Sequence, residues 1–310
     1  MSNILTITLN PTVDKSTSID KLVPEKKLRC AQPVFEPGGG GINVSRALKR
    51  LGLDSTAFFP SGGRTGKMLE SLLEKESIKN KAIAVAGETR ENFIVVETGT
   101  NQQFRFGMPG SEISSEEQKS LLDALNNLSP FPDFVVVSGS LPPGMKPEFL
   151  KEIVNTAKAK GAKVIADTSG EALKQMVDAG VFLLKPNLGE LGNLVGIETL
   201  DNDSADEAAQ KLIREGKTEA IVVSLGPQGA YLVTSDITKL VPAPAVKKLS
   251  TVGAGDSMVA GMVSILAKGG SFVEMVRMGV ACGSAATMNS GTQLFKKEDA
   301  ERLFDYLSRE

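Results

Sequence analysis

Residues 250–257, with the sequence STVGAGDS, contain the side chain best suited to chemistry in this chain. Two glycines flank Ala254, and apolar residues at helical spacing follow, which predicts a loop that turns into a helix. Backbone N–H groups at a helix start, together with the helix dipole, form a site for an anion. Asp256 lies at the edge of this site, where its carboxylate could take a proton from a hydroxyl group. An anion site beside a general base is what phosphoryl transfer to an alcohol requires.

A simpler explanation exists for the same stretch: Gly253 and Gly255 would form a turn, and Asp256 would only cap the helix. The stretch alone supports both explanations about equally. If Asp256 is the base, the helix dipole beside it predicts that the carboxylate stays ionised and that its pKa is not raised.

The composition favours a carboxylate as the base. The 310 residues include no histidine, two tyrosines and two cysteines, but 37 aspartates and glutamates. The lack of histidine excludes Ser-His and Cys-His catalysis and histidine-based metal sites. A net charge of -2 and a pI near 5.6 argue against binding to nucleic acid or to an anionic membrane.

Several features predict a protein of the cytoplasm. No apolar run is long enough to span a bilayer. The opening residues MSNILTI lack the basic region and cleavage site of a signal peptide and predict a first strand instead. Cys30 and Cys282 are too few for a disulfide framework in a chain of this length, which fits a reducing compartment.

Continuous apolar strands alternate with helical segments through most of the chain. This alternation predicts a doubly wound α/β fold with a mostly parallel sheet and helices on both faces, as one domain over residues 1–310. Two stretches, about 14–36 and 88–108, are short, alternating and more charged. They do not fit a parallel core, and we expect small antiparallel strands that pair into a projecting β-sheet, or lid.

Polar residues follow the expected strands at their carboxyl ends, where doubly wound proteins bind ligands. These residues are Asp14, Ser138, Gly139, Asp167, Lys185, Asn187, Ser224 and Gly226. Their repeated placement predicts one binding edge and carries more weight than any single motif.

Further motifs could bind ligands, and each has a structural alternative. The four glycines at 38–41 predict close approach of a ligand to the backbone rather than a packing turn, because one glycine suffices for a turn. Asn187 and Glu190 could help to hold Mg²⁺ with waters and phosphates, but the pair also matches a capping box, which is the more common outcome. Residues 224–229 form either an ordinary glycine turn or a contact to a nucleotide. No P-loop or dinucleotide fingerprint is present.

Together these motifs resemble those of the ribokinase-like PfkB carbohydrate kinases, over essentially the whole chain. The glycine motif at 38–43, the Asn-x-x-Glu motif at 187–190 and the TVGAGD motif at 251–256 stand in the family's order and spacing. The opening TLNPTVD at 8–14 resembles the phosphofructokinase and tagatose-6-phosphate kinase branch. Residues 27–44 are similar to the minor, PfkB-type bacterial 6-phosphofructokinases, and Gly40 stands where 1-phosphofructokinases usually carry lysine.

The resemblance implies an ATP-dependent kinase of glycolysis that converts fructose 6-phosphate to fructose 1,6-bisphosphate. A kinase for fructose 1-phosphate or tagatose 6-phosphate would use the same chemistry. A sugar-phosphate sensor without activity is the alternative of a different class. It is disfavoured because a base, an anion site and a metal motif are all present.

The resemblance also implies roles for individual residues. Asp256 would be the base for the 1-hydroxyl, and the anion site would consist of the backbone amides of Gly253, Ala254, Gly255 and Asp256. The sugar hydroxyls would be held by Asp14, Gly39 and Asn43, and the sugar phosphate by Lys27, Arg29, Arg90 and Ser138. The ATP site would be lined by Lys185, Asn187, Ser224, Gly226, Gly229 and Ser284. Glu190, with Asn187, would organise Mg²⁺ partly through water.

Two further expectations follow from the resemblance. Some members bind K⁺ beside the anion site, and the matching positions are Ser250, Val252, Ala286, Asn289, Gly291 and Gln293. The lid commonly pairs two subunits into a homodimer, in which Lys27 would reach the site of the neighbour. The surface charge of Lys27, Arg29 and Arg90 has a simpler explanation as solvated charge.

Overall fold

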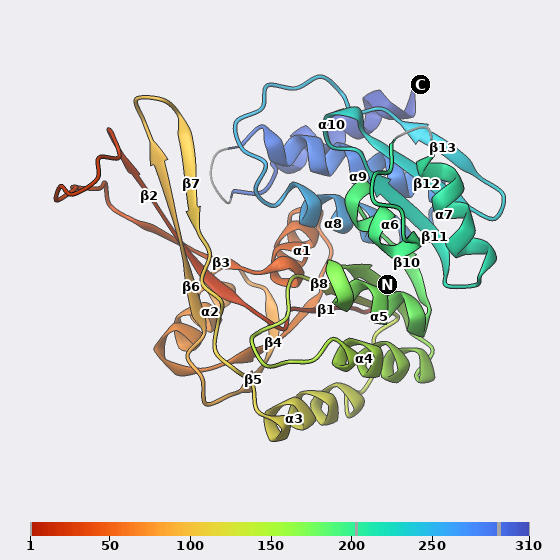
Figure 1. Ribbon diagram of the computed structural model, residues 1–310, viewed down its shortest axis with the longest axis horizontal. Helices are drawn as coiled ribbons and strands as arrows, with labels where there is room; N and C mark the ends of the chain where they lie inside the picture. The colour runs from red at the N-terminus through yellow and green to blue at the C-terminus, as the bar shows by residue number, and fades with distance from the viewer. Residues whose placement is uncertain (1, 202–203, 290–292, 310) are drawn as a thin grey trace.

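The computed structural model describes residues 2–201, 204–289 and 293–309. These residues form one nine-stranded sheet with helices on both faces, and a separate four-stranded sheet to one side of it (Figure 1). The fold is therefore α/β with a doubly wound sheet, as predicted.

The nine-stranded sheet forms the body of the molecule. Its order is β13-β12-β11-β10-β9-β8-β1-β4-β5. The strands are β1 (Ile4–Ile7), β4 (Thr56–Ser61), β5 (Lys79–Ala84), β8 (Phe134–Ser138), β9 (Lys163–Asp167), β10 (Val181–Leu184), β11 (Thr218–Ser224), β12 (Ala230–Thr234) and β13 (Thr238–Val241). All neighbours pair in parallel except β12 and β13, which add one edge in antiparallel fashion. The sheet is thus mostly parallel, in agreement with the sequence.

Helices cover both faces of this sheet. One face carries α1 (Gly40–Arg50), α8 (Ala254–Leu266), α9 (Phe272–Thr287) and α10 (Lys297–Ser308). The other carries α3 (Ser115–Asn126), α4 (Glu148–Ala159), α5 (Gly170–Ala179), α6 (Leu188–Val195) and α7 (Ala205–Arg214). Along β8, Val136 packs into the first layer while Val135 and Val137 pack into the second. Because both faces are buried, the central strands read as continuous apolar runs.

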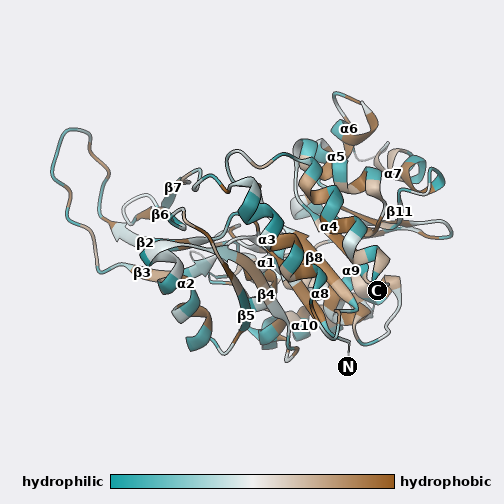
Figure 2. Ribbon diagram, turned by 90° about the horizontal axis from the view of Figure 1, so that it is seen from below, coloured by the Kyte–Doolittle hydropathy of each residue, from teal (hydrophilic) through white to brown (hydrophobic). Residues whose placement is uncertain are grey.

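The four-stranded sheet, here called the lid sheet, consists of two pairs of strands from separate parts of the chain. They are β2 (Thr12–Ile19), β3 (Val34–Gly38), β6 (Arg90–Glu97) and β7 (Gln102–Phe106), in the order β3-β2-β6-β7. The loop 20–33 between β2 and β3 extends away from the body (Figure 2). Helix α2 (Gly63–Lys75) packs against both β3 and β4 and so joins the lid sheet to the body.

The expectation that the lid strands pair only in antiparallel fashion was wrong for the central pair. β2 and β3 are antiparallel, as are β6 and β7, but β2 and β6 run parallel over eight positions, from Thr12 opposite Arg90 to Ile19 opposite Glu97. The reason is topological: β2 follows β1 and β6 follows β5. Since β1 and β5 are parallel strands of the body, both leave it at the same edge and in the same direction. No helix in the described part of the chain is long and apolar enough to cross a membrane.

Candidate active site

The predicted binding edge lies at the carboxyl ends of β1, β8, β9 and β10. Ser138 and Asp167 are direct neighbours in the register of β8 and β9, and Lys185 follows the strand next to them. From β1 the chain continues, through the lid, to α1 on one face, whereas from β8 it continues to α4 on the other. Connections that diverge from adjacent strands open a crevice at this edge, which is where doubly wound proteins bind ligands.

Two helix N-termini meet at this crevice. Helix α8 begins after Gly253, whose φ of 71° is a left-handed conformation that favours glycine, and Asp256 lies in its first turn. Helix α1 packs beside α8, and its Asn43 donates an Nδ2 hydrogen bond of 2.9 Å to Oδ2 of Asp256. The cap residue Gly253 has no side chain, and Asp256 lies inside the helix, so the simple capping explanation for Asp256 does not hold. The first-turn amides of α8 beyond Ala254 have no carbonyl within the helix to bind and can hold an anion.

The prediction that Asp256 keeps an unshifted, ionised carboxylate was wrong for the protein without ligands. Its pKa is raised from 3.8 to about 7, first because the surrounding protein removes water from the carboxylate and second because of the negative charge of Asp167. The hydrogen bond from Asn43 and the positive charge of Lys185 lower the pKa but do not offset burial. The helix dipole contributes only a fraction of a charge, so desolvation dominates. A base with a pKa near the operating pH is well matched to its task.

A chain of polar contacts runs across the strand ends beneath Asp256. Nζ of Lys185 lies 2.9 Å from Oδ1 of Asp167, and the hydroxyl of Ser138 donates to Oδ2 of the same carboxylate at 3.1 Å. Burial lowers the pKa of Lys185, but the charge and hydrogen bond of Asp167, together with the charges of Glu190 and Asp256, more than compensate, and the net pKa is raised. Lys185 therefore stays protonated, next to Gly255, and supplies a fixed positive charge.

The predicted sugar-binding residues on the lid side lie at its root. Asp14 in β2 is 7% exposed and accepts a hydrogen bond of 3.0 Å from Nδ2 of Asn92 in β6. Burial raises its pKa, which Asn92 and Arg90 partly oppose. Arg90 donates to the backbone carbonyls of Asn10 and Met108, at 2.9 and 2.7 Å. Arg90 thus fastens the lid strand to the loop after β1 while lying half-buried beside Asp14.

The four glycines at 38–41 have a packing explanation that the sequence did not favour. A Cβ at Gly38 would lie 2.5 Å from Oδ2 of Asp14, and one at Gly40 would lie 2.3 Å from Oγ of Ser138. A Cβ at Gly41 would lie 2.6 Å from the carbonyl oxygen of Ile7. Gly39 caps α1 with a φ of 110°. Gly40 and Gly41 therefore let α1 pack closely on the ends of β8 and β1, and Gly38 leaves room for Asp14 of the lid strand β2.

The predicted nucleotide-side residues gather around the ends of β10 and β11. Asn187 and Glu190 form a complete capping box at the start of α6, with both hydrogen bonds at 2.9 Å. Ser224 lies next to Asn187 through a single parallel bridge. Gly226 and Gly229 enclose the short turn between the antiparallel strands β11 and β12, which is an ordinary hairpin. Ser284 lies in α9, one residue after Gly283, which faces the start of α8.

The donor set at α6 fits a magnesium ion that arrives with a nucleotide. One oxygen of Glu190 and the amide oxygen of Asn187 already serve the capping box. No group of three or more acidic, cysteine or histidine residues able to hold a metal ion occurs within residues 2–201, 204–289 and 293–309. Mg²⁺ often binds through one or two carboxylates and substrate phosphates while it keeps several waters. Glu190 can support such an ion without a preformed cage.

Most positions expected beside K⁺ lie at the carboxyl end of α9. The N–H group of Ser250 donates to the carbonyl of Thr287, which brings the loop before α8 against the end of α9 at Ala286 and Asn289. Val252 donates its N–H to the hydroxyl of Ser250 at 3.2 Å. Gln293 is exposed, and Gly291 lies outside the described residues.

Two predicted phosphate-binding residues are not brought to this site by their own chain. Lys27 and Arg29 are exposed in the loop 20–33, which points away from the body (Figure 2). Another lid cation does approach it: Arg105 in β7 lies 3.5 Å from the hydroxyl of Thr251, in the loop before α8.

Sequence reasoning gave no role to Asp167, Asn92 or Asn10. Asp167 had been noted only as a polar strand end, yet it holds both Lys185 and Ser138. The same strand-end signal could have assigned it. Asn92 and Asn10 had no such signal, because their partners lie 78 or more residues away in the chain.

Comparison with known proteins agrees with this geometry. The sequence profile of the pfkB family carbohydrate kinases matches residues 3–299. The chain is 46% identical to the ATP-dependent 6-phosphofructokinase isozyme 2 of Escherichia coli (strain K12), over the full length of both. It is 41% identical to the isozyme 2 of Mycobacterium tuberculosis (strain ATCC 25618 / H37Rv), over 97% of this chain and 89% of that protein. The 1-phosphofructokinase of Bacillus subtilis (strain 168) is more distant, at 34% identity over 95% of this chain and 96% of that protein.

Solved structures of the Escherichia coli phosphofructokinase-2 have the same fold over the whole of both chains. They include complexes with potassium (TM-score 0.96, 46% identity) and with fructose-6-phosphate (0.94, 44%), and a tetrameric inhibited form (0.93, 44%). The family profile over residues 3–299 agrees with the identity and the fold over the full chain, and this chain belongs to the pfkB family of carbohydrate kinases.

Proposed function

We propose that this chain is an ATP-dependent 6-phosphofructokinase, which transfers the terminal phosphoryl group of ATP to the 1-hydroxyl of fructose 6-phosphate in glycolysis. The observation that carries the proposal is the carboxylate of Asp256 in the first turn of α8, held by Asn43. It lies in a chain that is 46% identical to a 6-phosphofructokinase over its full length.

In this proposal Asp256 accepts the proton of the 1-hydroxyl as its oxygen attacks the terminal phosphorus. The bond between that phosphorus and the bridging oxygen breaks, and ADP leaves with the electron pair. The amides of Gly253, Gly255 and Asp256 would bind the transferring group, and the dipole of α8 would also stabilise its charge. The amide of Ala254, which donates to the carbonyl of Thr251 at 3.4 Å, would join them once that contact opens. Lys185, kept protonated by Asp167, adds positive charge on the nucleotide side. Mg²⁺ bound with ATP would neutralise phosphate charge, and Glu190 and Asn187 would hold its waters.

We assign the phosphate end of the sugar to the root of the lid. Asp14, Gly39 and Asn43 would contact the hydroxyls, and Arg90 and Ser138 the 6-phosphate. Lys27 and Arg29 point away from their own site, so we propose that they act in the site of a second subunit. On the nucleotide side, Ser224, Gly226, Gly229 and Ser284 would line the cleft.

The lid sheet supports a homodimer. Three large apolar side chains are exposed on the lid segments: Val34 (58%), Phe106 (47%) and Met108 (46%). Phe106 lies in one register row with Phe93 and Phe35, whereas Val34 belongs to the next row and points to the other face of the lid sheet. Burial of the face that carries Phe106 against a second copy would remove apolar surface from water and hold two lids together. The tetrameric inhibited form of the Escherichia coli relative shows that larger assemblies of that protein exist.

The remaining expectations stay part of the proposal. We treat residues 1–310 as one kinase domain with the lid inserted at about 14–36 and 88–108. A K⁺ site at Ser250, Val252, Ala286, Asn289, Gly291 and Gln293 is supported by the contact of this loop with α9 and by the potassium complex of the Escherichia coli relative. An exposed, free Cys30 is typical of a reducing cytoplasm.

A coupled assay of ADP release tests the proposed function. The full chain is offered ATP and Mg²⁺ with fructose 6-phosphate, fructose 1-phosphate or tagatose 6-phosphate. We expect the highest kcat/KM for fructose 6-phosphate and a bisphosphate product. A preference for another of these sugars would change the assigned substrate and leave the proposed chemistry unchanged. Sugar binding by calorimetry without ADP release would show a sensor instead.

A further inference from the structure

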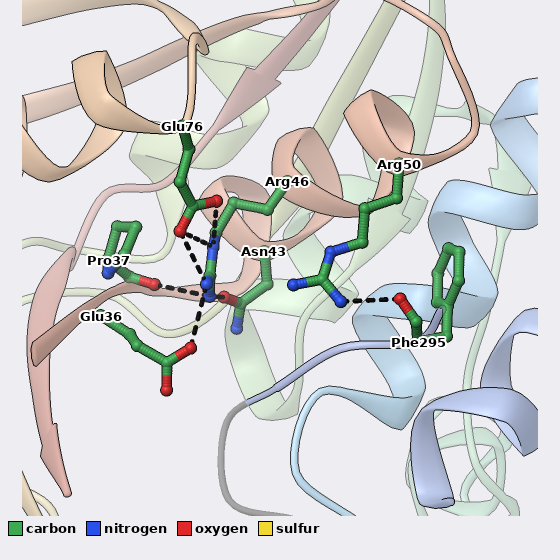
Figure 3. Close-up of polar contacts among 7 residues, drawn as sticks. All are labelled: Glu36, Pro37, Asn43, Arg46, Arg50, Glu76 and Phe295. Atoms are coloured by element: carbon green, nitrogen blue, oxygen red, sulfur yellow. Dashed lines mark hydrogen bonds and ion pairs between the residues drawn. The ribbon is translucent and has the colours of Figure 1, made fainter. Parts of the chain in front are cut away.

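Arg46 is a buried charge one helical turn after Asn43 on α1 (Figure 3). Its side chain is 2% exposed. Nε and Nη2 donate to the carboxylate of Glu76, at the end of α2, at 2.9 to 3.1 Å. Nη2 also reaches Glu36 of β3 at 3.2 Å, and Nη1 donates to the carbonyl of Pro37 at 3.1 Å. Arg46 therefore joins three elements: α1, α2 and the lid strand β3.

The guanidinium is permanently charged in this position. Burial lowers its pKa, but the hydrogen bonds and charges of Glu76 and Glu36 together raise the pKa by more than burial lowers it, so the net pKa is raised. Buried ion pairs of this kind often contribute little to stability compared with well-packed apolar side chains. Stability alone gives no strong reason for a guanidinium here, but one of its nitrogens, Nη1, has a second contact.

The fourth partner of Arg46 leads to the candidate base. Nη1 lies 3.5 Å from Oδ1 of Asn43, and the other end of the same amide, Nδ2, donates to Oδ2 of Asp256 at 2.9 Å. An asparagine amide has nearly the same shape after a 180° rotation, so only its partners decide which end points where. A guanidinium can only donate, and it therefore selects the oxygen of Asn43. The nitrogen is left to face Asp256.

We propose that Arg46 is a positioning residue for phosphoryl transfer: it fixes the amide of Asn43 with the nitrogen toward Asp256. The inference rests on the proposed role of Asp256 as the base. Without Arg46 the amide can rotate and present its oxygen to the carboxylate, which removes a hydrogen bond and adds repulsion. The carboxylate would then hold its proton more tightly and be a poorer acceptor below neutral pH.

Two pairs of variants separate this role from a purely structural one. Arg46→Met/Glu76→Met removes the guanidinium together with one carboxylate, so that Glu36, whose side chain is 15% exposed, is the one carboxylate partner left. Glu76→Met alone is the matched control, because it weakens the cluster and leaves Arg46 with Glu36 and Asn43. Arg46→Lys keeps the charge, but one ammonium nitrogen cannot serve Glu76 and Asn43 together. If the double variant does not fold, Arg46→Lys is compared with Glu76→Met in its place.

The measurement is the pH dependence of kcat from pH 5.5 to 9 with saturating ATP and sugar. We expect the acidic limb to move up by about one pH unit in the double variant and in Arg46→Lys, since a hydrogen bond to a charged group is of that size. At pH 6.5 kcat should then fall about tenfold, with much less change at pH 9. The KM for ATP should stay the same. Glu76→Met should keep the acidic limb of the unaltered enzyme.

An acidic limb that stays in place in both Arg46 variants would overturn the inference, as would an equal shift in Glu76→Met. The other charged groups that affect Asp256 are Asp167 on β9, Lys185 directly after β10 and Asp14 on β2, and all are kept in these variants. Failure of the proposed function is a separate outcome. It would appear as no ADP release by the unaltered enzyme with any of the three sugars.

Discussion

At the scale of single residues, the site depends on how Asp256 is surrounded. The sequence placed this carboxylate in the first turn of a helix, and the structure agrees. The prediction of its pKa was wrong because a helix dipole can be inferred from a helix start in the sequence. Burial of the carboxylate and the negative charge of Asp167 depend on the packing of residues from distant parts of the chain. The same limit applies to Arg46. A charged residue in a helix is normally predicted to be exposed, and no neighbouring residue in the sequence indicates that Arg46 is buried.

Replacement of Asp256 by asparagine should abolish most of the turnover. Asparagine keeps the shape but cannot accept the proton, so kcat should fall roughly 10²–10⁴-fold. Binding of ATP, measured by calorimetry, should change little. A variant that keeps most of its kcat would show that Asp256 is not the base.

The same variant should be more stable than the unaltered protein, and more so at high pH. In the folded protein Asp256 has a pKa of about 7 against 3.8 for the free group. Between these values the folded state holds a proton that the unfolded state lacks, so stability falls as pH rises from about 4 to about 7. Asparagine has no such penalty. The gain in Tm without ligands should be larger at pH 8 than at pH 5, and equal gains at both would contradict the assigned pKa.

At the scale of elements, helix starts and strand ends were the parts that the sequence predicted well. The apolar runs of β8 to β11 and the capping pair Asn187 and Glu190 are local signals, and both were found. β5 was not predicted, because it is an edge strand with Lys79 and Lys81 on an exposed side. The packing of Gly40 and Gly41 against β8 and β1 was not predicted, because it involves residues far apart in the chain. The predicted contact of this run with a ligand stays a prediction.

The packing role of the glycine run predicts a large cost for Gly41→Ala. The new Cβ would lie 2.6 Å from the carbonyl oxygen of Ile7, which is backbone of β1 and cannot move aside cheaply. We expect a loss of about 1–3 kcal/mol in the free energy of unfolding, measured with urea. Gly189→Ala is the control: Gly189 is exposed in α6, and its Cβ would meet only Oδ1 of Asn187, at 3.4 Å. There we expect no loss, or a gain of up to about 1 kcal/mol.

At the scale of the whole molecule, the body and the lid differ in how far the sequence determines them. Apolar periodicity specifies the layers of the body, since each strand must be buried on both faces. The parallel pairing of β2 with β6 depends on the route of the chain through β4 and β5, which no local pattern records. The assembly of several chains is determined even less by local sequence patterns.

The proposed dimer can be tested at Phe106, which is exposed on the lid sheet. Phe106→Glu would place a charge in the apolar surface that two lids are proposed to share, and it should convert dimer to monomer in sedimentation experiments. Activity should fall as well, because Lys27 would lose the neighbouring site. Ile197→Glu, at an equally exposed apolar residue (43%) outside the lid, should leave the assembly unchanged. Equal behaviour of the two variants would argue against a lid dimer.

The hydrogen bond between Asn43 and Asp256 joins residues 213 positions apart. During synthesis on the ribosome, the lid strands and α1 emerge long before α8 exists. A growing chain can therefore present most of its proposed sugar-binding surface while it still lacks Asp256, the proposed base. If Asp256 is the base, phosphoryl transfer becomes possible only when α8 has been made and has packed beside α1, and we expect an incomplete chain not to consume ATP.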